Sequence, residues 1–448
     1  MKKIALIATA SALLLSAIPL SASAAATFKL NVDGQTVQFS DAQPYKSGKD
    51  VMLPLRQTAQ ALGLKVEYLP ASKEASISGP AGTATVKPGS NQALIGGAAN
   101  VAFGADAAVK SNRMFVPLSF FERALGLRTA VHEDTSTASI FTAKQPPAPD
   151  SLIEEEIVVG AGTKYPLPGT LTLPKNASGP LPAVILVHGS GPNDRDETVG
   201  LAKPFRDLAW GLAEQGIAVL RYDKRTYAHG QSFTPDMLAS FTVKDETVDD
   251  AIAAAKLLKA DERIDASNVY IVGHSLGGML APRIDADGGD FAGLALLAGS
   301  PRTLWEIIAD QNAAIIATME EGNPAKTASE ALVAAEVEKA KSLAGLTDDE
   351  AKAQTLFGIP AYYFKEMDSR GADQIAARLT KPVLVLQGEA DVQVYADKDY
   401  VQWKETLKNN DKASFKLYPG LNHFFAKSAD GKVESQVIQD IADWINKR

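Results

Sequence analysis

The chain has 448 residues, of which 46% are hydrophobic and 22% are charged, a composition typical of a folded protein with two or three domains. Its net charge of -8 and isoelectric point near 5.3 exclude the basic surface of a nucleic-acid-binding protein and give no attraction to anionic membranes. The absence of cysteine excludes a thiol nucleophile, disulfides and lipidation of an N-terminal cysteine.

Residues 1–26 are predicted to be a signal peptide. Lys2 and Lys3 supply positive charge, residues 4–20 are apolar, and small residues follow in the pattern of a cleavage site. The alternative is a retained membrane anchor, but the apolar run is short for a spanning helix. We expect cleavage after Ala24 or Ala26 and export from a bacterium, with release and cell-wall association both open.

Residues 27–142 contain an internal repeat. "VMLPLRQTAQALGLKVEYL" begins at Val51 and "FVPLSFFERALGLRTAV" begins at Phe115, and Pro54 and Pro117 lie 63 residues apart in the same register. Each copy predicts a glycine-containing hairpin, a strand ending at Pro-Leu, a two-turn helix capped by a glycine, and two closing strands. The repeat therefore predicts a small duplicated α+β domain.

This first domain resembles the copper amine oxidase N-terminal-like domain, a stalk-like module of exported proteins. The resemblance covers about residues 28–141 and rests on the two P-L…A-L-G-L motifs. Copper sites need several imidazole or sulfur ligands, whereas His132 is the only histidine between Thr27 and Ala143. We therefore expect no metal here, and a role as a spacer, a dimerisation surface or a cell-wall attachment.

A Pro-rich linker, residues 143–151, leads to a second domain at residues 152–448. An expected antiparallel pair of strands opens this domain, and near-continuous apolar runs such as "AVILVHG" and "IAVLRYD" then alternate with helical segments. This pattern predicts an α/β fold with a mostly parallel, doubly wound sheet. About residues 300–380 interrupt the alternation with two or three predicted helices, which form either a cap or a layer packed on the edge of the sheet.

The candidate nucleophile is Ser275. "GHSLGG", residues 273–278, fits G-x-S-x-G and lies directly between a predicted strand and a predicted helix. Side chains in place of Gly273 and Gly277 would collide with neighbouring backbone in so tight a turn. The turn places the serine at a helix N-terminus, where free N–H groups favour developing negative charge.

A serine nucleophile needs a base, and the chain has only five histidines. His132 lies in the first domain, His274 within the tight turn, and His188 at the end of a strand where it shapes a loop. His229 is a weak candidate in a loop after "RYDKR". His423 follows the last predicted strand, where its loop can reach the serine, and is therefore the predicted base.

Asp391 is the predicted acid that orients His423, because it follows the preceding strand, with Glu389 and Asp397 as alternatives. The order Ser275, Asp391, His423 is that of α/β-hydrolases. The predicted oxyanion donors are the N–H groups of Leu276 and Ser190, with Gly191 as the second choice for the latter. No His/Asp cluster has metal-ligand spacing, so neither a metal nor a cofactor is expected.

Residues 152–448 resemble a bacterial α/β-hydrolase, similar to carboxylesterases related to the dienelactone-hydrolase branch. The motifs "HGSGPNDRDE", "RYDKR", "GHSLGG", "LLAGSPR", "LQGEAD" and "PGLNHFF" occur in the expected order. The resemblance implies a Ser-Asp-His esterase acting on short acyl chains. One departure is Thr226-Tyr227, where relatives often carry glycine; Asp223 and Arg225 before it are expected to form structural ion pairs.

The sequence thus predicts an exported serine carboxylesterase that forms an acyl-enzyme on a small ester substrate, with no nucleic-acid partner and no membrane span after signal removal. The cap aromatics Tyr362, Tyr363 and Phe364 are the predicted substrate contacts in an apolar acyl pocket. Two alternatives stay open: a peptidase or amidase of the same fold, and a non-catalytic protein that binds the cell wall or a ligand.

Overall fold

The computed structural model divides into two compact units, one within residues 28–142 and the other formed by residues 147–198 and 202–447. The predicted signal peptide, residues 1–26, and positions 143–146 of the predicted linker lie outside the described residues. No helix in the described part of the chain is both long and apolar enough to cross a membrane. The described residues are 28–33, 35–48, 50–79, 82–97, 99–132, 136–142, 147–199, 202–427 and 431–447.

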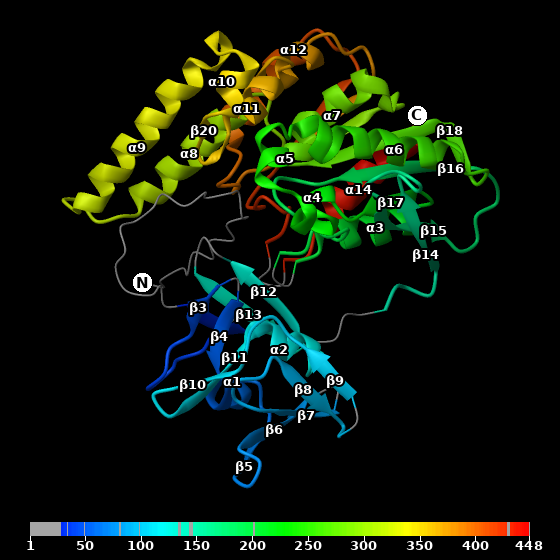
Figure 1. The fold of residues 1–448 in the computed structure, drawn as a ribbon. Coiled ribbons are helices and arrows are strands. Elements are labelled where there is room, and N and C mark those ends of the chain that lie inside the picture. The colour runs from blue at the N-terminus through cyan, green and yellow to red at the C-terminus, as the bar shows by residue number, and fades with distance from the viewer. Residues whose placement is uncertain are drawn as a thin grey trace, which may run out of the picture. The chain divides into compact units, whose positions relative to one another are not determined.

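The smaller unit is mostly β-structure with two short helices, α1 (Leu55–Ala61) and α2 (Leu118–Arg123) (Figure 1). Its sheets have the strand orders β12-β13-β1-β2, β10-β11-β4-β3 and β5-β6-β7-β8-β9. The strands are β1 (Lys29–Val32), β2 (Gln35–Thr36), β3 (Tyr45–Ser47), β4 (Asp50–Pro54), β5 (Val66–Leu69), β6 (Glu74–Gly79), β7 (Gly82–Val86), β8 (Gln92–Ile95), β9 (Ala99–Ala102), β10 (Ala108–Lys110), β11 (Arg113–Pro117), β12 (Arg128–His132) and β13 (Thr137–Phe141).

The two sequence copies form one interlocked unit. In each copy a strand ends at Pro54 or Pro117 and a helix follows, and the glycines after the helices, Gly63 and Gly126, have φ of 67° and 66° as expected of left-handed caps. Strand β1 of the first copy runs parallel to β13 of the second, and β4 pairs antiparallel with β11. The copies therefore share their main apolar core.

The larger unit is built on an eight-stranded sheet of order β14-β15-β17-β16-β18-β19-β22-β23. The expected antiparallel pair opens it, and β15 is also antiparallel to β17; the remaining neighbours are parallel. The strands are β14 (Leu152–Val159), β15 (Leu167–Pro174), β16 (Leu181–Val187), β17 (Ala218–Tyr222), β18 (Ile264–His274), β19 (Leu294–Leu297), β22 (Val383–Gly388) and β23 (Ala413–Tyr418).

Helices cover both faces of this sheet, which confirms the predicted doubly wound α/β class (Figure 1). In β16, Val184 and Leu186 pack with α3 (Pro204–Glu214) and α14 (Ser435–Asn446). Ala183 and Ile185, on the opposite face, pack with α6 (Asp249–Lys259), α7 (Leu276–Ile284) and α13 (Val401–Thr406). Two short α-helices also lie outside the insertion, α4 (Arg225–Ala228) and α5 (Pro235–Ala239).

The insertion after β19 contains more helices than expected. Its elements are α8 (Leu304–Ala317), α9 (Pro324–Lys341), α10 (Asp348–Lys352), β20 (Thr355–Leu356), β21 (Ile359–Pro360), α11 (Ala361–Asp368) and α12 (Ala372–Ala376). Helices of five to eight residues are too short to show a clear apolar period, which is why the sequence predicted only two or three. Ile307 of α8 and Phe364 of α11 belong to the same apolar core as α6 and α7.

Candidate active site

Ser275 occupies a strained turn between β18 and α7, with φ of 53° and ψ of −116°. A Cβ at Gly273 would lie 2.2 Å from the Gly277 carbonyl oxygen, and a Cβ at Gly277 would lie 2.1 Å from the Val187 carbonyl oxygen. Both distances are far below contact, so the turn requires glycine at these positions, as the motif predicted. The Ser275 N–H donates to the Leu297 carbonyl at 2.8 Å, and the residue stays half-buried.

His423 and Asp391 form a buried pair, 3% and 4% exposed. The Nδ1 of His423 donates to Asp391 Oδ2 at 2.8 Å, and the other carboxylate oxygen accepts the backbone N–H groups of Gln393 and Val394 at 2.8 and 3.1 Å. The alternatives Glu389 and Asp397 are exposed. With Nδ1 engaged by Asp391, Nε2 is the ring nitrogen left to accept a proton.

The loop after β16, residues 188–197, lies against the nucleophile. A Cβ at Gly189 would be 3.1 Å from Ser275 Cβ. Asn193 Nδ2 donates to the carbonyls of Gly189, Ser190 and Gly191 at 3.2, 3.1 and 3.3 Å. Because C=O and N–H of a trans peptide point in opposite directions, the N–H groups of Ser190 and Gly191 point away from Asn193.

The Leu276 N–H is also free for an oxyanion, because Leu276 is the first residue of α7 and an N–H at that position has no acceptor within its own helix. Buried Lys224 donates from Nζ to the Gly189 carbonyl at 2.7 Å, which further fixes the peptide that carries the Ser190 N–H. The predicted oxyanion donors therefore lie at a helix N-terminus and on a loop held in place from its carbonyl side.

The charged residues of the loop are held by partners outside it. Asp194 accepts from the N–H and hydroxyl of Thr198, and Asp196 pairs with Arg221 and Lys203. Arg195 pairs with Asp223. The expected structural ion pairs of Asp223 and Arg225 are present, the latter with Asp250.

Two of the remaining histidines are engaged away from the nucleophile. His188 is buried, and its Nε2 donates to the Asp194 carbonyl at 3.0 Å; burial lowers the pKa of His188 to about 4, so it is neutral. His229 Nε2 donates to the Pro166 carbonyl at 2.8 Å. His132 lies in β12 of the smaller unit.

The sequence did not reveal Glu197, which pairs with His274. Glu197 Oε2 lies 2.9 Å from His274 Nδ1, and both side chains are buried. Its neighbours in "NDRDE" are equally charged, so nothing in the pattern marks this carboxylate as the one that faces the active-site turn. The only available signal was the position of His274 next to Ser275.

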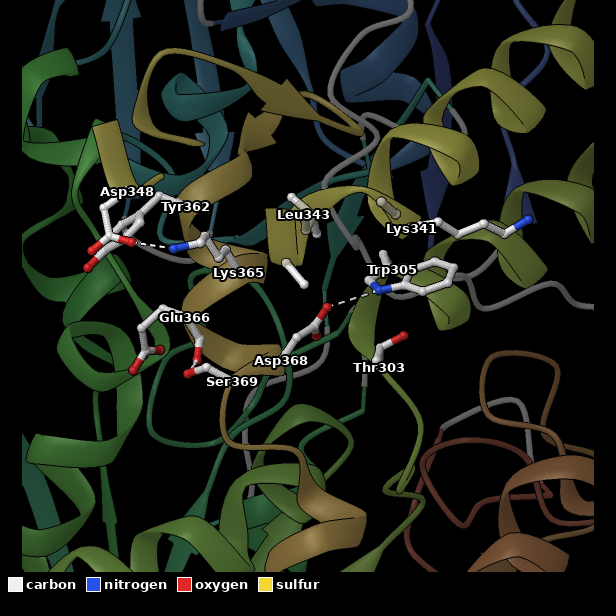
Figure 2. Close-up of a pocket in the computed structure, with 12 residues that line it drawn as sticks. Thr303, Trp305, Lys341, Leu343, Asp348, Tyr362, Lys365, Glu366, Asp368 and Ser369 are labelled. Atoms are coloured by element: carbon white, nitrogen blue, oxygen red, sulfur yellow. Dashed lines mark hydrogen bonds and ion pairs between the residues drawn. The ribbon is translucent and has the colours of Figure 1, made fainter. Parts of the chain in front are cut away.

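The predicted substrate contacts have different surroundings. Tyr362 lines a pocket of about 630 Å³ within the insertion, together with Trp305 and Leu343 (Figure 2). Tyr363 and Phe364 are buried, and the Tyr363 hydroxyl donates to Glu246 at 2.6 Å. Among the described residues lining this pocket, neither Ser275 nor His423 occurs, so contact of these three aromatics with substrate stays a prediction.

Each of the two predicted domains matches a known protein family. Residues 184–434 match the model of the alpha/beta hydrolase family, and residues 31–140 match that of the copper amine oxidase N-terminal domain. Esterase EstD of Thermotoga maritima is 39% identical over 310 residues, which are 67% of this chain and 69% of that protein.

Two solved structures of low sequence identity also match the larger part of the chain. Est1E from Butyrivibrio proteoclasticus is 16% identical with a TM-score of 0.43, over 65% of this chain and 99% of that one. A dienelactone hydrolase from Anabaena variabilis is 16% identical with a TM-score of 0.38, over 66% of this chain and 98% of that one.

The name of the first family raises the question of copper. No group of three or more His, Cys, Asp or Glu side chains that could hold a metal ion occurs among the residues that the structure describes. The described residues of the smaller unit thus do not supply the ligands that a copper site needs.

Proposed function

The chain belongs to the α/β hydrolase family and is a carboxylic ester hydrolase, and on this premise we propose that it cleaves short-acyl esters through Ser275, His423 and Asp391. Ser275 Oγ attacks the ester carbonyl while His423 Nε2 takes its proton and then passes it to the leaving alcohol. Asp391 holds the Nδ1–H tautomer of His423. Water then hydrolyses the acyl-enzyme by the same proton route.

The charge that develops on the carbonyl oxygen is received by the N–H groups of Leu276 and Ser190, with Gly191 as the alternative to Ser190. The observation that carries the proposal is the buried 2.8 Å contact between His423 Nδ1 and Asp391, which leaves Nε2 of the histidine available as the base. The strained backbone of Ser275 supports it, because strain of this kind gathers at functional positions.

Ser275→Ala tests the nucleophile. We expect turnover of p-nitrophenyl acetate to fall by about 10³-fold or more, because the acyl-enzyme can no longer form. A fluorophosphonate probe should label the unaltered protein at Ser275 and leave the variant unlabelled. Ser267→Ala, an exposed serine on the same strand, is the control and should keep full activity. Substantial turnover by Ser275→Ala would refute the mechanism.

Substrate profiling separates ester from amide chemistry. Esters of increasing acyl length compared with dipeptide amides should show preference for the short esters; a higher kcat/KM on amides would support the peptidase alternative. Failure of the fluorophosphonate to label any residue would support a non-catalytic binding role.

We also propose that the protein is exported and cleaved after Ala24 or Ala26, on the basis of its N-terminal composition. The smaller unit would then serve as a spacer, a dimerisation surface or a cell-wall attachment. N-terminal sequencing of the mature protein from a bacterial culture, with separate assay of wall and supernatant fractions, tests this; an intact Met1 in the mature protein would contradict export by cleavage.

A further inference from the structure

Three segments of the active site meet at His274, the residue just before the nucleophile. His274 Nε2 donates to the backbone carbonyl of His423 at 3.0 Å, and Nδ1 faces Glu197 Oε2 at 2.9 Å. The other oxygen of Glu197, Oε1, accepts the Gly189 N–H at 2.7 Å. A continuous polar chain thus runs from the loop of the oxyanion donors, through Glu197 and His274, to the loop of the base.

The protonation state of His274 follows from these partners. A carbonyl oxygen only accepts, so Nε2 carries a hydrogen, and the carboxylate at Nδ1 favours a second one. Burial lowers the pKa of His274, but the charge of Glu197 and the two acceptors outweigh this, and the pKa is raised above its ordinary value. Burial likewise raises the pKa of Glu197, yet the adjacent imidazolium outweighs it and the pKa is lowered. The 2.9 Å approach of the two side chains and both pKa directions thus favour the charged pair.

The backbone around this pair is strained. Glu197, Ser275 and Phe425 have φ of 52°, 53° and 58°, in the left-handed region that side chains disfavour. One of these residues lies on each of the three segments that meet at His274. Such strain persists only where surrounding contacts enforce it, and it gathers at functional sites.

We propose that Glu197 and His274 are positioning residues that hold the oxyanion loop and the His423 loop in the mutual register that ester hydrolysis requires. Glu197 fixes the Gly189 peptide, which directly precedes the Ser190 N–H, while His274 fixes the main chain of His423. Neither side chain needs to touch substrate. This inference rests on the function proposed above and concerns the spacing of its two loops.

The register of the two loops matters because the oxyanion donors and His423 act on the same tetrahedral intermediate. Oxyanion donors must lie about 2.7–3.1 Å from the position that the developing oxyanion will occupy, and a shift of about 1 Å can cost about 100-fold in rate. Loss of the ion pair would free each loop to move separately. The defect should therefore appear in the binding of the transition state more than in the binding of substrate.

The first test is Glu197→Gln, which keeps an acceptor for Gly189 and removes the charge opposite His274. We expect kcat to fall about 10- to 100-fold with KM changed less than about 2-fold. The inhibition constant of a trifluoromethyl ketone, which forms a tetrahedral adduct on serine, should rise by the same factor as kcat/KM falls. Glu197→Asp, which keeps the charge on a shorter arm, should recover part of the loss.

The matched control is Asp250→Asn, a carboxylate-to-amide change at another buried ion pair, with Arg225 on α4. It should leave the trifluoromethyl ketone affinity unchanged. A folded Glu197→Gln protein with wild-type kcat/KM, or one whose loss of activity lies wholly in KM, would overturn the inference.

A spectroscopic measurement reads the protonation state of His274 directly in the unaltered protein. In protein labelled with ¹⁵N-histidine, the five histidines give separate side-chain signals that single His→Gln variants assign. His274 should show the shifts of an imidazolium at neutral pH, and a neutral ring would overturn the proposal. Failure of the proposed function looks different, because Ser275→Ala would then keep its activity whatever the state of His274.

Discussion

At the scale of single residues, the carboxylate of Asp391 is the most constrained group of the site. One oxygen accepts two backbone N–H groups, and the other accepts from His423 Nδ1 and from Gln387 Nε2 at 3.0 Å. We expect Asp391→Asn to lower kcat by about 10⁴-fold with the fold intact, because an amide donating to Nδ1 would select the wrong tautomer of the base. Steady-state kinetics with p-nitrophenyl acetate measure the loss in kcat, and circular dichroism checks that the fold is intact.

Glu389→Gln is the control for that change. Glu389 lies two residues earlier at the same strand end but is exposed, so its loss should leave kcat within about 2-fold. Equal effects of the two substitutions would show that the strand end as a whole, and not the Asp391 carboxylate, supports activity.

The sequence predicted His423 and Asp391, which the structure shows as a contacting pair, because few candidates existed and because strand ends of a parallel sheet share one edge. The sequence could not predict the contact of Glu197 with His274, and the reason is physical. Its role depends on a left-handed turn that aims one carboxylate, out of several in "HGSGPNDRDE", at His274. Local pattern does not specify such an orientation, whereas the glycines of the Ser275 turn are specified by direct steric exclusion.

At the scale of elements, helix α11 of the insertion carries a carboxyl in an unfavourable place. Asp368 is its last residue, where the helix dipole disfavours negative charge, and its Oδ2 accepts from Trp305 Nε1 at 3.0 Å (Figure 2). Burial raises the pKa of Asp368 to about 6. The unfolded chain releases this proton near pH 3.9, approximately the ordinary aspartate value. The folded protein thus holds more protons in between, and this group's contribution to stability falls as pH rises through that window.

Asp368→Asn removes that cost and keeps an acceptor for Trp305. We expect the free energy of unfolding of the variant to equal that of the wild type at about pH 4. Above about pH 6.5 it should be about 1 kcal/mol higher, a difference kept small because the side chain is partly exposed. Urea unfolding at several pH values measures the difference. Asp348→Asn is a contrasting control: Lys365 lowers the pKa of Asp348, so its substitution should cause a small loss of stability above its pKa. A difference in unfolding free energy between Asp368→Asn and the wild type that does not change with pH would contradict the raised pKa of Asp368.

The elements differ in how well they could be predicted, and α11 and its neighbours are the clearest case. The buried parts of β16, β18 and β22 are the short apolar runs AVILV, VYIV and VLVL, so the sequence alone identifies them. Helices α10 to α12 are separated by turns that include Phe357, with φ of 48°, and Gly358. Their ends depend on tertiary packing that the sequence pattern does not contain.

At the scale of the whole molecule, each of the two units has its own apolar core residues. The repeat predicted two similar halves in the smaller unit, but pairing of β1 with β13 and of β4 with β11 joins them into one core. Pairing between distant strands carries no local sequence signal, because it depends on register along both strands. The cores on the two faces of the hydrolase sheet draw their residues from the larger unit alone.

Separate cores predict separate unfolding. We expect calorimetry of the mature protein to show two transitions, and inactivation of p-nitrophenyl acetate hydrolysis to follow only one of them, because all three proposed catalytic residues belong to the larger unit. Phe120→Ala, in the core of the smaller unit, creates a cavity at a fully buried site. It should lower the midpoint temperature of only that transition which is not accompanied by loss of activity. Leu296→Ala, in the hydrolase core, should lower the other transition together with activity. A single transition shifted equally by both substitutions would show that the two units unfold as one.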